Sequence, residues 1–407
     1  MQKKLSEDMK KSIIYTGNFN IIDMNAAGKR VWGNVQILKK LGYNVILICM
    51  PSNKDNGNQS TNIVVFQGVK VYTYSLNLCK KNRWRVFSFF REFKKIVGNI
   101  LNENDVSHII MYSTPTLALM NSFIIRYAKK KNMAVIADVV DWLTPNSDSI
   151  FFNLFKKFEA YYENVVVALR CDGIIAISDW LKDYYEKRNK KVVVIPPIAE
   201  TEDVDFVANS QAKIVYAGVP FRSGVKITNY AQMKDRIDLI IELLLKVKRN
   251  GGRFELNIIG VTQKELLDSL PKLENSVQEL GESIIFHGKK TIEYVKRVLI
   301  NADFSILIRD DIRATRAGFP TKVSESIGCG TPVITNKTSN IIKYLSEDNS
   351  VIYINDISDE TIDKVTCAVN DSTIVRGERK DFCRNNNPFS EEKFEWDMKK
   401  FIENIYV

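Results

Sequence analysis

The chain has 407 residues, of which 45% are hydrophobic and 26% are charged, so the length predicts two domains and the composition excludes a disordered, fibrous or low-complexity protein. No stretch approaches the ~18 uncharged apolar residues of a membrane-spanning helix. The net charge of +10 is concentrated in residues 1–100, which hold 17 Lys and Arg against 5 Asp and Glu; this indicates either a local surface for a membrane or an acidic ligand, or a solvated basic face.

The beginning of the chain and its cysteines favour a cytoplasmic protein. The first residues are charged and lack the apolar run of a signal peptide. The six cysteines are scattered without a CxxC spacing, which is typical of reduced thiols in the cytosol. Because the only two histidines are His108 and His287, we expect no metal site.

Short apolar, β-branched runs alternate with segments of helical period along residues 1–198. Buried strands that alternate with helices indicate a parallel, doubly wound sheet. The expected strands are 12–17, 44–50, 62–66, 108–112, 134–140, 173–178 and 192–196. The expected helices are 28–41, 87–101, 116–131 and 152–169.

The same alternation begins again after a polar stretch at 199–212, which reads as a linker. The expected strands are 213–218, 254–260, 283–288, 303–308, 331–335 and 350–354, and a helix is expected at 231–250. The sequence therefore predicts an α/β protein with two Rossmann-like, doubly wound domains, at 1–198 and 213–387. Because open sheets bind ligands at the carboxyl ends of their strands, we expect a binding cleft between the domains.

The most informative segment is AGFPTKVSESIGCGTPVIT at 317–335. We expect a helix over 321–328, with Pro320 in its first turn. The N–H groups at such a helix start, together with Lys322, favour an anion such as a diphosphate. Glu325, one turn later, can accept hydrogen bonds from ribose hydroxyls. A capped crossover helix with a Lys–Glu surface pair fits the same spacing.

This segment resembles the donor-binding segment of retaining glycosyltransferases with the GT-B architecture, specifically glycosyltransferase family four. GFP at 318–320, Glu325 and CGTPVI at 329–334 match the family consensus. The resemblance extends over nearly the whole chain, through CDGIIAISDWL, VIPP, YAG, KDRIDLIIELL and the closing FSEEKFEWDMKKFIENI. It implies two Rossmann-like domains facing a central cleft, with the helix at 388–407 crossing back to the N-terminal domain.

The resemblance also implies roles for individual residues. Glu325 matches the glutamate that binds the donor ribose, and Lys234 matches a basic residue that contacts the diphosphate. Asp141 resembles an aspartate on the acceptor side, so Asp141 and Lys234 are the expected catalytic residues. Either Arg222 or Lys226 could supply a companion cation. The expected donor-binding residues are Gly28, Gly218, Arg222, Lys234, Phe319, Thr321, Lys322 and Glu325.

One departure from the family pattern concerns the donor sugar. The first family glutamate, which touches the sugar hydroxyls, falls at Ala317. A charged cluster lies nearby, in which Arg309 or Arg316 either contacts phosphate through two hydrogen bonds or is a solvated loop charge.

The expected function is transfer of a sugar from a nucleoside diphosphate sugar, UDP-sugar in particular, to a glycan acceptor. The resemblance implies retention of the anomeric configuration, and the lysines suggest electrostatic stabilisation without metal or cofactor. The acceptor is expected to be a lipid-linked glycan or a cell-surface polysaccharide. The alternative is a non-catalytic GT-B-fold protein that binds a nucleotide sugar or a partner. No recognised reader motif predicts binding to nucleic acid.

Residues 80–95, KKNRWRVFSFFREFKK, interleave cations with aromatic residues. Such a segment can lie in an anionic bilayer, which would place the protein at the inner face of the cell membrane. The other interpretation is a helix whose phenylalanines pack on the N-terminal sheet while its basic ends stay in water.

Overall fold

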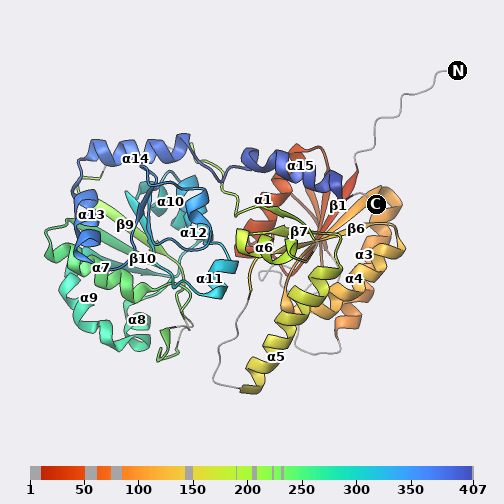
Figure 1. Ribbon diagram of the computed structural model, residues 1–407, viewed down its shortest axis with the longest axis horizontal. Helices are drawn as coiled ribbons and strands as arrows, with labels where there is room; N and C mark the ends of the chain where they lie inside the picture. The colour runs from red at the N-terminus through yellow and green to blue at the C-terminus, as the bar shows by residue number, and fades with distance from the viewer. Residues whose placement is uncertain are drawn as a thin grey trace. The chain divides into compact units, whose positions relative to one another are not determined.

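The computed structural model describes residues 11–50, 62–74, 85–142, 150–188, 190–203, 209–221, 224–230 and 233–405 (Figure 1). The chain divides into two compact units, the first made of 1–198 with 391–407 and the second of 199–390. Each unit is built on one mostly or wholly parallel sheet, as the alternation of apolar runs and helical segments predicts. Within the described residues, no helix has the length and apolar character needed to cross a bilayer.

The sheet of the first unit has eight strands in the order β3-β4-β2-β1-β5-β6-β7-β8. Every pair is parallel except β3 with β4. The strands are β1 (Ser12–Gly17), β2 (Asn44–Cys49), β3 (Asn62–Phe66), β4 (Val69–Thr73), β5 (Val106–Tyr112), β6 (Ala134–Val139), β7 (Gly173–Ala176) and β8 (Lys191–Val194).

Strand β4 was not predicted, because a tight hairpin separates it from β3. The two turn residues, Gln67 and Gly68, have φ angles of 45° and 79°. Two successive positive φ angles are the mark of a two-residue hairpin turn that matches the strand twist. The hairpin forms the antiparallel edge of the sheet.

The helices of the first unit include its C-terminal segment. Gly173 at the start of β7 has room for no side chain, because a Cβ there would lie 2.2 Å from Ile405 and 2.8 Å from Phe401. The closing helix α15 therefore packs directly on this sheet. The helical segments are α1 (Ala26–Lys40), α3 (Arg85–Glu103), η1 (Pro115–Leu117), α4 (Ala118–Lys130), α5 (Ile150–Tyr161), η2 (Tyr162–Val167), η3 (Ala168–Arg170), α6 (Asp179–Glu186), η8 (Glu391–Phe394) and α15 (Glu395–Asn404).

The single helix expected at 152–169 is instead three segments. Helix α5 ends at Tyr161, and the chain continues through a π-helical segment and a short 3₁₀ turn. The buried Glu163 lies in the π-helical segment, where its carboxylate accepts a hydrogen bond of 2.8 Å from Asn121 on α4. A wider helical turn is a common way to direct such a side chain inward.

The sheet of the second unit has the order β11-β10-β9-β12-β13-β14, the arrangement of dinucleotide-binding folds. Its strands are β9 (Ala212–Ala217), β10 (Phe254–Ile259), β11 (Ile284–Gly288), β12 (Phe304–Leu307), β13 (Val333–Thr335) and β14 (Val351–Tyr353). Its helical segments are α7 (Ile237–Arg249), α8 (Gln263–Ser269), η5 (Pro271–Leu273), α9 (Glu274–Leu280), η6 (Gly281–Ser283), α10 (Ile292–Asn301), α11 (Arg313–Ala317), α12 (Thr321–Gly328), η7 (Ile341–Lys343), α13 (Asp359–Asn370) and α14 (Thr373–Asn385).

Helix α7 begins six residues later than the predicted 231–250. The preceding segment is held by the loops at the strand ends instead, with Lys234 N–H donating to the carbonyl of Pro220 and Arg236 N–H to that of Ile308. Asp235 is buried between these two anchors. The segment therefore lies against the carboxyl edge of the sheet.

Candidate functional site

The strand order of the second unit reverses between β9 and β12. Such a switch point is where open α/β sheets bind ligands, just beyond the carboxyl ends of the strands. Gly218 directly follows β9, and Arg309 lies two residues beyond the end of β12. Residues that converge here are the first candidates for a functional site.

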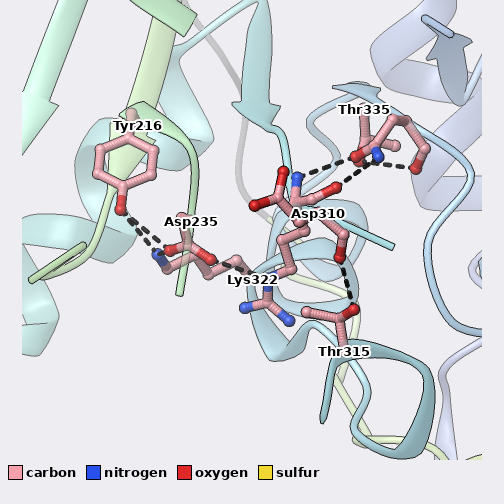
Figure 2. Close-up of polar contacts among 8 residues, drawn as sticks. Tyr216, Asp235, Asp310, Thr315, Lys322 and Thr335 are labelled. Carbon is pink, nitrogen blue, oxygen red and sulfur yellow. Dashed lines mark hydrogen bonds and ion pairs between the residues drawn. The ribbon is translucent and has the colours of Figure 1, made fainter. Parts of the chain in front are cut away.

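Asp235 is the centre of a charged cluster at this switch point, and it is 1% exposed. One carboxylate oxygen accepts a hydrogen bond of 2.8 Å from Arg309 Nε, and the other accepts one of 3.0 Å from Tyr216 OH. Lys322 Nζ donates to the same oxygen as Tyr216 (Figure 2). Burial opposes the ionisation of Asp235, but Lys322 and Arg309 outweigh it and hold its pKa well below the usual range. One carboxylate and two cations give the cluster a net positive charge.

Lys322 is the partly exposed member of this cluster. Its side chain is 25% exposed, and Nζ lies 4.5 Å from the centre of the Tyr216 ring. Burial lowers the pKa of Lys322, while Asp235 acts in the opposite direction. A Cβ on Gly218 would lie 2.0 Å from Nζ, so only glycine lets the ammonium group rest on the backbone beyond β9. The cluster thus presents one cation at the switch point.

Lys322 belongs to the first turn of α12, whose observed range, Thr321–Gly328, confirms the predicted one. Pro320 is the N-cap residue rather than part of the first turn. Because the first N–H groups of a helix lack intrahelical acceptors, the start of α12 adds partial positive charge beside the lysine.

Arg309 is not a solvated loop charge, which was one of its two predicted roles. It is buried, and its backbone is pinned by reciprocal hydrogen bonds with Asn336, of 3.0 and 2.7 Å. Its Nε donates a hydrogen bond to the carboxylate of Asp235. Arg309 is therefore a buried support for Asp235, whereas Arg316 is exposed and pairs with Asp311 at 2.6 Å, as the solvated interpretation predicts.

Lys234 and Arg236 flank Asp235 in sequence and differ in role. Lys234 is exposed, and its charge contributes to the lowered pKa of Lys322. Arg236 forms ion pairs of 2.7 Å with both Asp238 and Asp310, and so ties α7 to the loop after β12. Sequence reasoning missed Asp235 and Arg236; the signal was a run of alternating charges, KDRID, directly before an apolar helix.

The other expected donor residues of this unit are in different environments. Thr321 and Glu325 are half-buried on α12. The Phe319 side chain is buried, with its ring 5.8 Å from Tyr344 and 5.7 Å from Phe389, so it is a core residue.

Three further positions complete the comparison with the predicted donor site. Arg222 lies outside the described residues, and Lys226 is exposed. Ala317 is fully buried, so the position of the absent family glutamate is part of the core.

Two predicted residues belong to the first unit. Gly28 lies in the first turn of α1, where a Cβ would be 2.2 Å from the carbonyl oxygen of Asn20. The glycine is thus required by the preceding loop of the protein itself. Asp141 is half-buried two residues after β6. Burial raises the pKa of Tyr112, and the negative charge of Asp141 raises it further.

An aromatic cluster follows Asp141 at the same edge of the first sheet. The Trp142 ring lies 5.6 Å from Trp180 and 4.6 Å from Tyr184 on α6. Trp180 and Tyr184 are stacked at 5.9 Å, and Arg188 lies over the Tyr184 ring at 3.7 Å. Asp141 thus stands beside a group of half-buried rings.

Three of the four phenylalanines of residues 80–95 pack against other rings of the first unit. Phe93 is buried, Phe89 lies 5.2 Å from Tyr74, and Phe90 lies 5.3 Å from Phe123. This arrangement is the packed interpretation for these three rings. Phe87 remains exposed, and residues 80–84 lie outside the described part of the chain.

Known proteins that are similar in sequence or in structure share this fold. Residues 225–371 match the family described as Glycosyl transferases group 1. Sucrose-phosphate synthase from Thermosynechococcus elongatus is similar over 98% of this chain and 99% of its own, at 13% identity and a TM-score of 0.62. The apo lipopolysaccharide outer core galactosyltransferase WaaB is similar over 97% and 99%, at 15% identity and a TM-score of 0.58.

A third similar structure is Anabaena HepE in complex with UDP and glucose, over 97% of this chain and 100% of its own, at 11% identity and a TM-score of 0.61. No curated protein sequence matches the chain. The family match and the two-sheet fold together lead to one assignment: residues 225–371 form a glycosyl transferases group 1 domain, and the chain as a whole has the GT-B fold of these glycosyltransferases.

Proposed function

We propose that the protein transfers a sugar from a UDP-sugar to a glycan acceptor, without metal and with retention of the anomeric configuration. The observation that carries the proposal is the cluster of Lys322, Asp235 and Arg309 at the switch point of the second unit. It gives a net positive, partly exposed group at the place where this class of sheet binds ligands.

The donor diphosphate is the group that this cluster suits. Negative charge grows on the diphosphate as the sugar departs, and fixed positive charge lowers the energy of that transition state. Lys322, the start of α12 and the exposed Lys234 supply such charge from one edge of the sheet. Because these cations neutralise the leaving group, the proposed mechanism needs no divalent metal.

We assign Glu325 to binding the nucleoside part of the donor, and the backbone N–H groups near it to binding the phosphates. Glu325 stands one turn after Lys322 on α12 and can accept hydrogen bonds from vicinal ribose hydroxyls. Thr321 contributes its backbone N–H, as does Phe319, whose side chain is committed to the core. HepE, which has the same fold, was solved with UDP and glucose, and this supports uridine as the base.

The acceptor is assigned to the first unit. We assign to Asp141 the hydrogen bond from an acceptor hydroxyl, and Trp142 and Trp180 provide apolar ring surface of the kind that lines ligand sites. Gly28 shapes the loop before α1. We propose a lipid-linked glycan or a growing cell-surface polysaccharide as the acceptor and the inner face of the cell membrane as the location.

A donor screen that scores released nucleotide tests this function. The full chain is incubated with UDP-sugars and an acceptor glycan mixture, once with EDTA and once with magnesium. We expect equal turnover in both, and a loss of about 10²-fold for Lys234→Met. Arg316→Met removes an exposed cation that pairs with Asp311, and it should keep wild-type turnover.

The second candidate function is a non-catalytic nucleotide-sugar binder, which the absence of the first family glutamate at Ala317 favours. Tight binding of UDP-sugars with no released nucleotide from any donor would support that function. Loss of all turnover in EDTA, restored by metal, would contradict the proposed mechanism.

A further inference from the structure

Helix α5 (yellow in Figure 1) exposes four large apolar or aromatic residues to solvent. Leu154 is 66% exposed, Phe155 40%, Phe158 62% and Tyr161 57%. These four residues are called the α5 apolar face below. Large apolar side chains are normally scattered singly over a protein surface, so four on one short helix need an explanation.

Over residues 153–161, the polarity of α5 is the reverse of that of an ordinary surface helix. At about 100° per residue, the α5 apolar face covers an arc of about 120°. On the remaining arc, the described side chains of Asn153, Lys156, Glu159 and Ala160 are half-buried or buried, and Lys157 at the edge of the arc is exposed. Lys156 and Glu159 form an ion pair of 2.7 Å there. A helix that serves only the core of its own unit would bury the apolar arc and expose the ion pair.

Neighbouring elements extend this apolar surface. The short helix η1 packs against α5, and the exposed Leu119 lies in the first turn of α4, which follows η1 directly. Further along α4, Phe123 contacts the exposed Phe87 of α3 at a ring distance of 5.7 Å. The exposed apolar residues thus run over three helices of the first unit.

The charge of the first unit identifies the kind of partner. Residues 1–198 with 391–407 hold 32 Lys and Arg against 21 Asp and Glu, a net charge of +11, whereas 199–390 have a net charge of −1. Lys157 is exposed on the same side of α5 as the apolar face. Phenylalanine, leucine and tyrosine with a flanking lysine are typical of a helix that lies in a bilayer interface. Two copies of a +11 unit repel each other, which disfavours self-association through this face.

We propose that the α5 apolar face docks on an anionic lipid bilayer, with α5 lying in the plane of the interface. Leu154, Phe155 and Phe158 enter the boundary between headgroups and acyl chains, while Lys157 and the hydroxyl of Tyr161 stay among the headgroups. This assignment differs from the one based on 80–95, whose Phe89, Phe90 and Phe93 are committed to packing. It rests on the membrane location given under the proposed function and names the surface that docks; because docking needs neither donor nor acceptor, its failure would leave the donor-binding claim untouched.

Vesicle co-sedimentation of the full chain tests the proposal. The vesicles are phosphatidylcholine alone or phosphatidylcholine with about 30% phosphatidylglycerol, a composition on the order of natural anionic membranes. We expect binding that needs the anionic lipid and weakens in high salt. The double variant Leu154→Ser/Phe158→Ser should bind at least about tenfold more weakly, and Lys157→Glu several-fold more weakly.

A matched control removes an equally exposed apolar residue elsewhere. Ile374 on α14 is 72% exposed, and Ile374→Ser should bind vesicles as the wild type does. Thermal melts of all variants should coincide, because each changed side chain is exposed. Light scattering reports whether the free protein is monomeric. Equal binding by the wild type and the double variant, no binding by either, or a dimer that the double variant converts to monomer would each overturn the proposal.

Discussion

The two units contain similar buried networks that serve different ends. In the first unit, Asp138 on β6 accepts hydrogen bonds of 2.6 Å from Tyr15 on β1 and 2.9 Å from Arg30 on α1. In the second, Asp235 accepts from Tyr216 on β9 and from Arg309. Each network joins a tyrosine of the first strand, a carboxylate and an arginine.

The difference lies in one residue. Asp138 and Arg30 are sealed from solvent, and Arg30 also donates to the carbonyls of Ile195 and Pro196, so the first network is charge-balanced and closed. The second network adds Lys322, which is partly exposed and makes the total charge positive. A buried ion pair alone therefore holds a sheet edge together, and in the proposed function the extra cation makes the second arrangement an anion site.

The largest expected effects come from removing the two carboxylates. Asp138→Ala and Asp235→Ala each leave a buried cation without its partner, so each should lower the free energy of unfolding by about 3–5 kcal/mol in urea titrations. Only Asp235→Ala should also abolish UDP binding by the folded fraction. Asp268→Ala, which removes an exposed pair with Lys264, is the control and should change stability by less than about 0.5 kcal/mol. If folded Asp138→Ala protein failed to bind UDP, the claim that only the second network serves UDP binding would be wrong.

The second prediction separates the effect of the Lys322 charge on turnover from effects on the stability of the fold. Lys322→Met keeps most of the side-chain volume and removes the charge at the switch point, so kcat/KM should fall about 10²–10³-fold. Arg30→Met should lower stability while each folded molecule keeps wild-type turnover. Steady-state kinetics on samples with a measured folded fraction decide this, and unchanged kcat/KM in Lys322→Met would contradict the assignment.

A third prediction concerns pH and the first unit. Burial raises the pKa of Glu163 to about 7, although Asn121 and neighbouring groups act in the opposite direction. Because the folded protein binds this proton more tightly than the unfolded chain does, the stability falls as pH rises from about 4.5 to about 7.

Glu163→Gln should therefore stabilise the protein at pH 8 relative to the wild type and remove that decline. The amide oxygen can still accept the hydrogen bond from Asn121. Urea unfolding of both proteins at pH 5 and pH 8 measures the effect. Parallel stability curves for the two would show that Glu163 does not titrate in this range.

The smallest expected effects come from two glycines. Gly218→Ala forces Lys322 Nζ away from the position it occupies, so UDP affinity should fall several-fold with a modest loss of stability. A Cβ added to Gly98 on α3 would meet no atom within 4 Å, so Gly98→Ala should stabilise the helix by about 0.5–1 kcal/mol and leave UDP affinity unchanged. Calorimetric titration with UDP compares the two; equal affinity in both variants would mean that Lys322 does not need this position.

Apolar runs and helix-start residues predicted the elements whose ends are set by nearby residues. Strands β1 and β3 and helix α12 have the predicted bounds because apolar runs and a helix-starting proline mark their ends. The start of α7 was wrong because hydrogen bonds to distant loops, at Pro220 and Ile308, hold residues 234–236 out of the helix.

The candidate site was predictable only in part for the same reason. Lys322 was recognised from its helix start, but its partner Asp235 is 87 residues away in sequence, and no local spacing joins them. The buried position of Arg309 depends likewise on Asp235 and Asn336. The exposed apolar arc of α5 was missed because periodicity shows that an arc exists without showing which side faces the sheet.

The most direct test of the account is UDP-induced stabilisation of the full chain. At a UDP concentration of about 100 times its dissociation constant, the wild type should gain about 2.7 kcal/mol in free energy of unfolding. Glu325→Ala should fold as the wild type does and lose most of that gain, because the ribose contact on α12 is removed. A full gain in Glu325→Ala, or no gain in the wild type at any UDP concentration, would contradict the claim that the second unit binds the donor at the switch point of its sheet.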